Sequence, residues 1–343
     1  MTAERSTPAS GARPDAVLFL ETRGSGLSSN LVAVRNALLS ERPDLELRYL
    51  VFKPAKTWVG RALQRQTVRV ACRGAAWVVS SSDSLPPTMP AIAVGKKRIL
   101  IQPVRQHMLG GEPVAFDWSR YTDVVAQSAF VGAAVQREVD ASPSVRVHAT
   151  GLPAADRFAS PEAVSRALRS LRFLAPRAEG RKIITLTTMR KARTLLAHVD
   201  LAQLAEQLSS EYFLVIKAAE TEEVLRRYPA TLSEFVFDAK SSLRNNEHLL
   251  ATDVLLTTVF ADATLFATSR RQVRLLCSPG DAQGLGPLLP ARFADLTLPD
   301  LTRLPDSLAL PDGAAISASF ADEYAGDNDG RATDALLREL FAR

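Results

Sequence analysis

The sequence predicts an α/β fold with two parallel sheets, and three observations lead to this prediction. Short apolar runs alternate with amphipathic stretches almost throughout the chain, which is typical of βαβ units. The chain has 343 residues, which suggests two domains at about 150 residues per domain. Hydrophobic residues make up 46% of the chain, enough for two buried cores.

The first half begins with a buried strand over 16–20, followed by a loop and a helix over 31–39. Each later strand of this half is a short apolar run bounded by polar or turn-forming residues. In chain order we expect a strand over 45–51, a basic helix over 59–71, strands over 77–80, 99–102 and 121–126, a helix over 130–139 and a strand over 145–149.

The second half repeats this alternation. It opens with a helix over 161–174 and a polar linker over 175–181 that is rich in Pro, Arg and Gly. After the linker we expect strands over 183–186, 213–216, 235–237, 254–257 and 273–276, a helix over 199–208, a loop over 278–290, a flexible acidic stretch over 322–329 and a last helix over 332–341.

Four segments follow from this pattern. We expect a disordered leader over 1–15, a first domain over 16–174, a second domain over 175–320 and a flexible segment with a helix over 321–343. Two open α/β halves joined near residue 175 are typical of the GT-B architecture, in which two Rossmann-like domains face a central cleft. Ligands of such sheets bind outside the carboxyl ends of the strands.

Charge and composition narrow the partners. The net charge of +5 suits nucleotide phosphates, a phosphate-bearing polymer or an anionic membrane face, although an arginine bias also arises from GC-rich coding. No apolar run is long enough for a membrane-spanning helix. The sequence also lacks a Lys/Arg run with interleaved aromatic residues, the pattern that would indicate nucleic-acid binding. The basic helix over 59–73 is the one candidate for peripheral contact with the inner membrane face.

Cysteine and histidine spacing predicts neither a disulfide nor a metal site. Cys72 and Cys277 lie far apart, and the four histidines show no metal-ligand spacing. The cytoplasm is therefore the expected compartment. The oligomeric state is left open.

A glycine-containing loop follows the first predicted strand and leads into the first helix. Gly24 and Gly26 lie in this loop, where a turn and a helix N-terminus can hold a phosphate. The third glycine of a dinucleotide fingerprint is missing, and the second strand ends in Phe52-Lys53 rather than in an acid. Both differences argue against a nicotinamide dinucleotide, so no cofactor is expected. A plain tight turn is the alternative.

Polar side chains end three strands of the second half. Thr188 and Arg190 follow one strand, Lys217 ends the next, and Thr257-Thr258 ends a third. Hydroxyl and cationic groups at the shared edge of a parallel sheet suit a pyrophosphate, and the helix after Thr258 adds its N-terminus. The alternative for Arg190 is an arginine in a basic surface loop.

The stretch over 246–276 resembles the donor-binding stretch of the CDP-glycerol glycerophosphotransferases, the family of teichoic-acid polymerases and primases. The matching framework residues are Leu249, Leu250, Asp253, Val254, Thr257, Phe266 and Ala267. The positions that contact substrate in the family are replaced: its Asp, two Ser and second Asp fall on Thr258, Phe260, Ala261 and Leu265.

Further motifs resemble the family in the same order along the chain, over residues 16–280. They include 20–30, 148–158, with its Gly-Leu-Pro turn, and 183–190, where Thr188 and Arg190 are retained. In the motif over 99–110 the family's presumed catalytic histidine falls on Arg105, which cannot accept a proton but can bind a phosphate. His107, two residues further on, is the candidate for the missing base.

The resemblance implies one of two functions. The first is transfer of a polyol phosphate or related group from a CDP-activated donor to a hydroxyl acceptor, in cell-envelope polymer or secondary-metabolite synthesis. The second is a catalytically degenerate relative that uses the same cleft to bind a ligand or a partner subunit, which the replaced residues favour.

Overall fold

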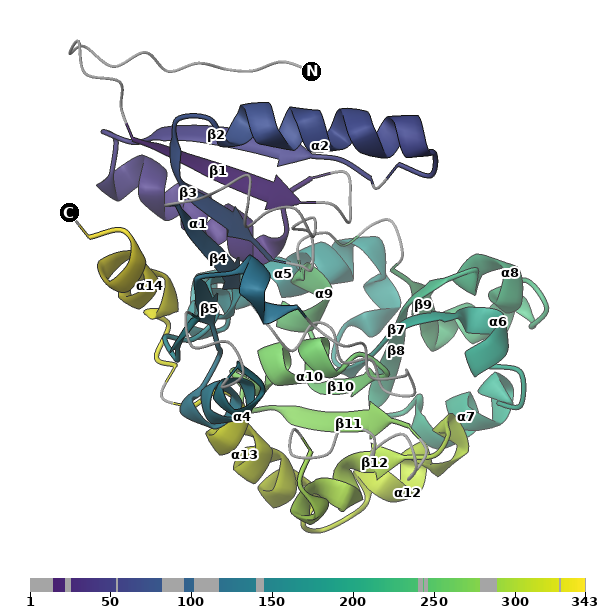
Figure 1. Cartoon of the computed structure of the whole chain (residues 1–343). Helices are drawn as coiled ribbons and strands as arrows, with labels where there is room; N and C mark the ends of the chain where they lie inside the picture. Colours follow the sequence, from purple (N-terminus) through teal and green to yellow (C-terminus); the bar gives the residue numbers. More distant parts are fainter. Residues whose placement is uncertain are drawn as a thin grey trace.

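The structure is a computed structural model that describes residues 15–21, 26–53, 55–81, 96–101, 117–139, 145–239, 243, 246–277, 289–326 and 328–342. These residues form two separate parallel sheets with helices packed around them (Figure 1). The predicted α/β fold class is confirmed. Two of the predicted segments, the leader over 1–15 and the loop over 278–290, lie almost wholly outside the described residues.

The first sheet has the strand order β2-β1-β3-β4-β5-β6, with every neighbouring pair parallel. Strand β1 is buried at every residue, which explains why its sequence is a continuous apolar run without polar alternation. The strands are β1 (Ala16–Glu21), β2 (Glu46–Val51), β3 (Ala75–Ser80), β4 (Lys97–Ile101), β5 (Asp123–Val125) and β6 (Arg146–His148). Around them lie α1 (Ser29–Glu41), α2 (Trp58–Cys72), η2 (Trp118–Arg120) and α4 (Ala129–Val139).

The second sheet has the order β12-β11-β10-β7-β8-β9 and is parallel as well. Its strands are β7 (Lys182–Lys191), β8 (Tyr212–Ala219), β9 (Val236–Asp238), β10 (Val254–Thr257), β11 (Gln272–Leu276) and β12 (Thr297–Leu298). The helices that follow β6, up to α13, are η3 (Pro153–Ala159), α5 (Pro161–Leu174), η4 (Pro176–Ala178), α6 (Ala192–Leu195), α7 (Leu201–Leu208), α8 (Thr221–Leu225), η5 (Ala230–Glu234), α9 (Glu247–Leu250), α10 (Phe260–Ala267), η7 (Ala291–Leu296), η8 (Leu301–Arg303) and α12 (Leu304–Leu308).

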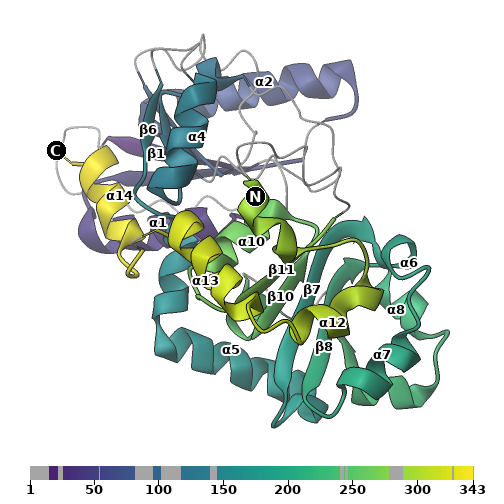
Figure 2. The same cartoon turned by 90° about the horizontal axis from the view of Figure 1, so that it is seen from below.

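The chain ends with two helices, α13 (Gly313–Tyr324) and α14 (Ala332–Leu340) (Figure 2). Helix α13 packs against α10 and β11 of the second sheet and also contacts α4, whereas α14 packs against α1 beside the first sheet. Helix α13 continues through Asp322, into the acidic stretch for which the sequence predicted flexible backbone. The reason is aromatic packing: the buried Tyr324 ring stacks on Phe320 at 4.1 Å and meets the edge of Phe130 of α4 at 5.1 Å. The buried face of α13 combines small residues with two aromatic rings, so no continuous apolar run in the sequence marks it.

Helix α14 is held at both ends by residues of the first half. At its N-terminus, the Asp156 carboxylate accepts hydrogen bonds from the backbone N–H groups of Ala332 and Thr333, both at 2.9 Å. At its C-terminus, the Leu340 carbonyl accepts from Trp77 Nε1 and Lys97 Nζ, both at 3.0 Å. One apolar core consequently extends from β1 and β4 through α10 and β11 to α14.

None of the helices within the described residues is both long and apolar enough to cross a membrane.

Candidate functional site

The candidate site lies at the carboxyl edge of the second sheet, where β7 and β10 end side by side. Thr187 of β7 pairs in register with Thr257 of β10. The Thr187 hydroxyl donates to the Thr257 hydroxyl at 2.8 Å, and both side chains are buried. Because the Thr257 oxygen also accepts from the backbone N–H of Val259 at 2.8 Å, this bridge fixes the turn that leads into α10.

A second threonine bridge follows one residue further along both strands. The Thr258 hydroxyl donates to the Thr188 hydroxyl at 2.8 Å, and the Thr188 oxygen accepts from the backbone N–H of Arg190 at 2.9 Å. Thr258 is buried and Arg190 is exposed. The structure therefore brings together four residues that the sequence predicted as donor-binding: Thr188, Arg190, Thr257 and Thr258.

Lys217 lies near the carboxyl end of the neighbouring strand β8 in a half-buried position, and its amine donates to the carbonyl of Leu243. Burial lowers the pKa of Lys217, while the negative charges of Asp262 and Glu247 act in the opposite direction. Asp262 lies in the first turn of α10. The N-terminus of α10, the positive end of its dipole, therefore already has a carboxylate close to it. No separate sequence signal indicated this role of Asp262.

His248 of α9 is the second residue that sequence reasoning missed at this edge. Its side chain is buried, and within the described residues its Nδ1 has no hydrogen-bond partner. Burial, reinforced by the positive charge of Lys217, lowers the pKa of His248 to about 3. The imidazole is neutral at physiological pH. Its lone place in the sequence, outside any histidine motif, gave no signal of this burial.

Phe260 and Ala261 stand where the resembled family has two serines, and both are buried. The Phe260 ring points into the core, where it meets the edges of Phe320 at 6.4 Å and Tyr324 at 5.5 Å. These two replacements therefore strengthen the packing of α10 on α13 and supply no hydroxyl at the sheet edge.

The carboxyl edge of the first sheet carries a buried carboxylate. The Ser28 hydroxyl donates to Ser81 at 2.6 Å, and the Ser81 hydroxyl donates to Glu21 at 2.8 Å. Glu21 ends β1 and is 2% exposed. Gly26 is exposed nearby, and a Cβ added there would contact nothing. Three other predicted site residues, Gly24, Arg105 and His107, lie outside the described residues.

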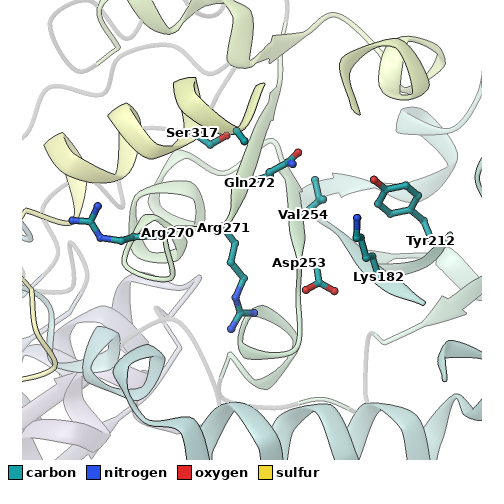
Figure 3. A pocket seen from close by; sticks show the side chains of 9 residues that line it. Lys182, Tyr212, Asp253, Val254, Arg270, Arg271, Gln272 and Ser317 are labelled. Atoms are coloured by element: carbon teal, nitrogen blue, oxygen red, sulfur yellow. The ribbon is translucent and has the colours of Figure 1, made fainter. Parts of the chain in front are cut away.

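Two cavities lie away from the threonine bridges. One of about 460 Å³ opens beside the carboxyl ends of β5 and β6, under α13 and α14. Gln127 lines it and is buried, and its amide atoms have no hydrogen-bond partner among the described residues. The other, of about 240 Å³, lies at the amino ends of β7, β8 and β10, where Lys182, Tyr212 and Asp253 surround it (Figure 3). Neither cavity contains a residue that the sequence predicted to bind the donor.

Metal chemistry has no support among the described residues. They contain no group of three or more His, Cys, Asp or Glu side chains that could hold an ion. The chemical groups present at the second sheet's edge are hydroxyls, an exposed guanidinium, a half-buried amine and backbone N–H groups. This combination suits binding of an anion.

Comparison with solved structures finds the same fold over nearly the whole chain. A single-residue variant of the wall teichoic acid polymerase TagF soaked with CDPG superposes with a TM-score of 0.68 at 14% identity, covering 94% of this chain and 87% of that chain. MnaA of S. aureus in a co-structure with UDP gives 0.62 at 13% identity, covering 96% and 97%. The Glycyrrhiza uralensis UGT complexed with glycyrrhetinic acid 3-O-monoglucuronide gives 0.55 at 9% identity, covering 96% and 95%.

These structures establish the predicted GT-B fold for the chain. No family model matches the sequence. No curated protein matches it either.

Proposed function

We propose that this chain binds a CDP-activated donor at the carboxyl ends of β7, β8 and β10 and transfers a polyol phosphate, or a related group, to a hydroxyl acceptor. The pair of threonine bridges carries the proposal. The bridges join the turn before α10 to the backbone of Arg190 through Thr188. A helix N-terminus and a guanidinium so arranged can hold the two phosphates of a nucleotide diphosphate.

In the proposed reaction the acceptor oxygen attacks the β-phosphorus of the donor, and the bond from this phosphorus to the oxygen of the leaving CMP breaks. The acceptor proton passes to a base, a role that we propose for His107, with Arg105 as a further phosphate ligand. Arg190, Lys217 and Thr188 would neutralise or hydrogen-bond the charge that builds up on the leaving nucleotide.

The structural neighbours support a nucleotide in this fold. Two of them are ligand complexes, TagF soaked with CDPG and MnaA with UDP. The choice of cytidine over uridine rests on the resemblance of 246–276 to the glycerophosphotransferases.

A second candidate function is a non-catalytic GT-B relative that binds its ligand without turnover. One set of contacts favours it: the polar groups at the site are engaged with each other or with the backbone. Thr258 bonds Thr188, Thr187 bonds Thr257, and Lys217 bonds the Leu243 carbonyl. A donor would have to displace some of these contacts.

Thermal shift with CDP-glycerol, CDP and UDP, followed by an assay for CMP release, separates the two functions. A donor that binds the folded protein but not the unfolded chain raises the melting temperature. A rise specific to cytidine nucleotides together with CMP release supports the transferase. A rise without CMP release with any hydroxyl acceptor supports the binding protein. No rise with any of the three nucleotides contradicts both.

We propose the cytoplasm as the compartment. Cys72 and Cys277 are both buried cysteines in the thiol state, not in a disulfide. Burial raises the pKa of Cys72 to about 11, so this thiol stays protonated and unreactive at physiological pH. Cysteines kept as thiols are the usual state in a reducing compartment.

A further inference from the structure

The amino ends of the second sheet surround the cavity of about 240 Å³ that Figure 3 shows. Four strands reach this cavity with their first residues: Tyr212 of β8, Lys182 of β7, Val254 of β10 and Gln272 of β11. These residues lie side by side, because Lys182 pairs in register with Tyr212 and Val254 pairs with Gln272. The cavity therefore lies at the opposite end of the sheet from the proposed donor site.

Three hydrogen-bond donors of this cavity, the Lys182 amine, the Tyr212 hydroxyl and the Gln272 amide, face one common space (Figure 3). Among the described residues the Lys182 amine donates only to the exposed Glu211 carboxylate, at 2.7 Å, although it has three N–H groups. Burial raises the pKa of Tyr212 and the charge of Glu211 adds to this, so the hydroxyl keeps its proton at physiological pH. The Gln272 amide oxygen lies 3.5 Å from Arg274 Nη2, which leaves its NH2 group to donate to a ligand.

Arg274, behind Gln272, is a buried guanidinium without a carboxylate partner among the described residues. It is 1% exposed and donates to the Ser307 hydroxyl at 2.5 Å and to the carbonyls of Ser307 and Val273, both at 2.9 Å. Its remaining contacts, with Ser317 and Gln272, are neutral as well. Burial lowers the pKa of Arg274, but an arginine keeps its charge in proteins. Because a buried charge without a counter-ion is costly, an anion close to Arg274 would be stabilised.

The two other arginines beside the cavity each have a carboxylate near them. Arg270 forms an ion pair with Asp322 at 2.6 Å, and Figure 3 shows its side chain directed away from the three donors. Burial lowers the pKa of Arg271, and the negative charge of Asp253 acts in the opposite direction. Since Lys182 is paired with Glu211 in the same way, the positive charge left over at this end of the sheet is that of Arg274.

We propose that this cavity binds a phosphate group, either free or as part of a small phosphate monoester. Lys182, Tyr212 and Gln272 would each donate to one phosphate oxygen, and Arg274 would add its positive charge from behind. A phosphoryl group has three strong acceptor oxygens, one for each donor, whereas a carboxylate has two. The volume of about 240 Å³ lies below the roughly 300–1,000 Å³ of pockets for drug-sized ligands, so the ligand is small. Glu211 is exposed and can turn into solvent when the phosphate binds. This inference is independent of the proposed donor chemistry.

Calorimetric titration of the full chain with inorganic phosphate, glycerol 3-phosphate and acetate tests the proposal. We expect both phosphates to bind more tightly than acetate, and the tighter of the two phosphates shows whether the site prefers the free ion or a monoester. Two exposed residues should have opposite effects. Lys182→Gln should weaken phosphate binding about tenfold, because it removes a hydrogen bond between charged groups. Glu211→Gln should strengthen phosphate binding, because it removes the carboxylate that competes for the Lys182 amine.

The exposed ion pair of Arg226 with Glu222 offers matched controls, because it lies after the carboxyl end of β8, away from the cavity. Arg226→Gln and Glu222→Gln should bind phosphate like the wild type, and all four variants should melt close to the wild type because the side chains are exposed. Arg190→Ala should also keep phosphate binding. The proposal is overturned if the folded wild type binds neither phosphate, or if Lys182→Gln binds phosphate as tightly as Arg226→Gln does. It is also overturned if Arg190→Ala abolishes the binding, since the phosphate would then lie at the donor site.

Discussion

His248 shows at the scale of a single residue how burial changes chemistry that the sequence suggests. The sequence offered four histidines without a motif, and the structure places this one beside Lys217 in a buried position. A buried imidazole next to a cation is held neutral. It can serve neither as a cation for a phosphate nor as a strong base. Its value to the chain is in packing, and it makes stability depend on pH.

We predict that His248 destabilises the protein as the pH falls. Its folded pKa of about 3 lies below the ordinary value of 6.5. Between these values the unfolded chain binds a proton that the folded chain does not, so the free energy of unfolding decreases as pH drops, by up to about 1.4 kcal/mol per pH unit. Chemical denaturation of wild type and His248→Leu from pH 7 to 4 measures this.

The stability difference between the two proteins should change in favour of the leucine variant as the pH falls. His198 is exposed, so His198→Leu is the control for replacing a histidine by leucine outside the core. Parallel pH profiles of wild type and His248→Leu would show that His248 is not held neutral by burial.

Asp262, Glu247 and His248 also mark the limit of prediction at this scale. The sequence identified Thr188, Arg190, Thr257 and Thr258 because polar residues at strand ends carry a signal that survives without an alignment. Which charged groups lie near Lys217 depends on where α9 and α10 are placed relative to β8, and these segments are far apart in sequence. No local pattern encodes that placement.

At the scale of elements, strand positions were predictable where the apolar run was continuous, as in β1 and β10. The two-residue β12 was not, because so short a strand has no period to detect. Helix α13 was not predicted, since its buried face uses aromatic rings spread among acidic and small residues. Helix α14 was predicted as a helix, but its attachment to the first half was not.

The Asp156 cap is a testable part of that attachment. This residue lies in the Gly-Leu-Pro motif and accepts from two N–H groups at the start of α14, as well as from the Thr333 hydroxyl at 2.6 Å. We predict that Asp156→Ala lowers the free energy of unfolding by about 1–2 kcal/mol, the usual effect of losing an N-cap. Asp334, exposed in the first turn of the same helix, is the control. Equal effects of Asp156→Ala and Asp334→Ala would contradict the capping role.

His148 connects the first sheet to the other end of α14. Its Nε2 lies 2.9 Å from the Asp123 carboxylate and its Nδ1 2.6 Å from that of Glu339. The hydrogen bond to Asp123 raises the pKa of His148; burial opposes this, and the contact with Glu339 adds to it. For Asp123, burial raises the pKa, but the hydrogen bonds from His148 and Thr122 outweigh it, so that its pKa is lowered.

Because the pKa of His148 is raised in the folded protein, its contribution to stability must fall as the pH rises. The stabilisation by protonated His148 is fully present below about pH 6.5, the ordinary histidine value, and is lost as the pH rises through the raised folded pKa. We therefore expect the amide hydrogens of α14 to lose protection from exchange when the pH is raised from 6 to 9, after correction for intrinsic exchange rates. His148→Gln should show low protection at both values. Protection of the wild-type helix that does not change with pH would contradict this role.

At the scale of the whole molecule, β10 and β11 of the second sheet share an apolar core with the first sheet. The contacting rings of Phe260, Phe320 and Tyr324 belong to the second half of the chain. They nevertheless lie in the same apolar core as residues of β1, β3 and β4 of the first sheet. The two-sheet architecture followed from alternating apolar runs in the sequence. Its closure by α13 and α14 did not, because that closure depends on packing between the two ends of the chain.

The same architecture places the candidate donor site at the carboxyl edge of the second sheet, opposite the cavity of Figure 3. This placement is the central claim, and Arg190 tests it because it is exposed at that edge and its backbone is fixed by Thr188. Arg177 is the matched control: it is exposed, pairs with Glu234 at 3.2 Å, and precedes the opposite end of β7.

The most direct measurement is calorimetric titration of CDP-glycerol into wild type, Arg190→Ala and Arg177→Ala. A hydrogen bond to a charged group contributes about 1.5–3 kcal/mol, so we predict that Arg190→Ala binds the donor at least about tenfold more weakly while Arg177→Ala binds it like the wild type. Equal affinity of all three proteins for CDP-glycerol, or binding that Arg177→Ala weakens and Arg190→Ala does not, would contradict a donor site at the carboxyl ends of β7 and β10.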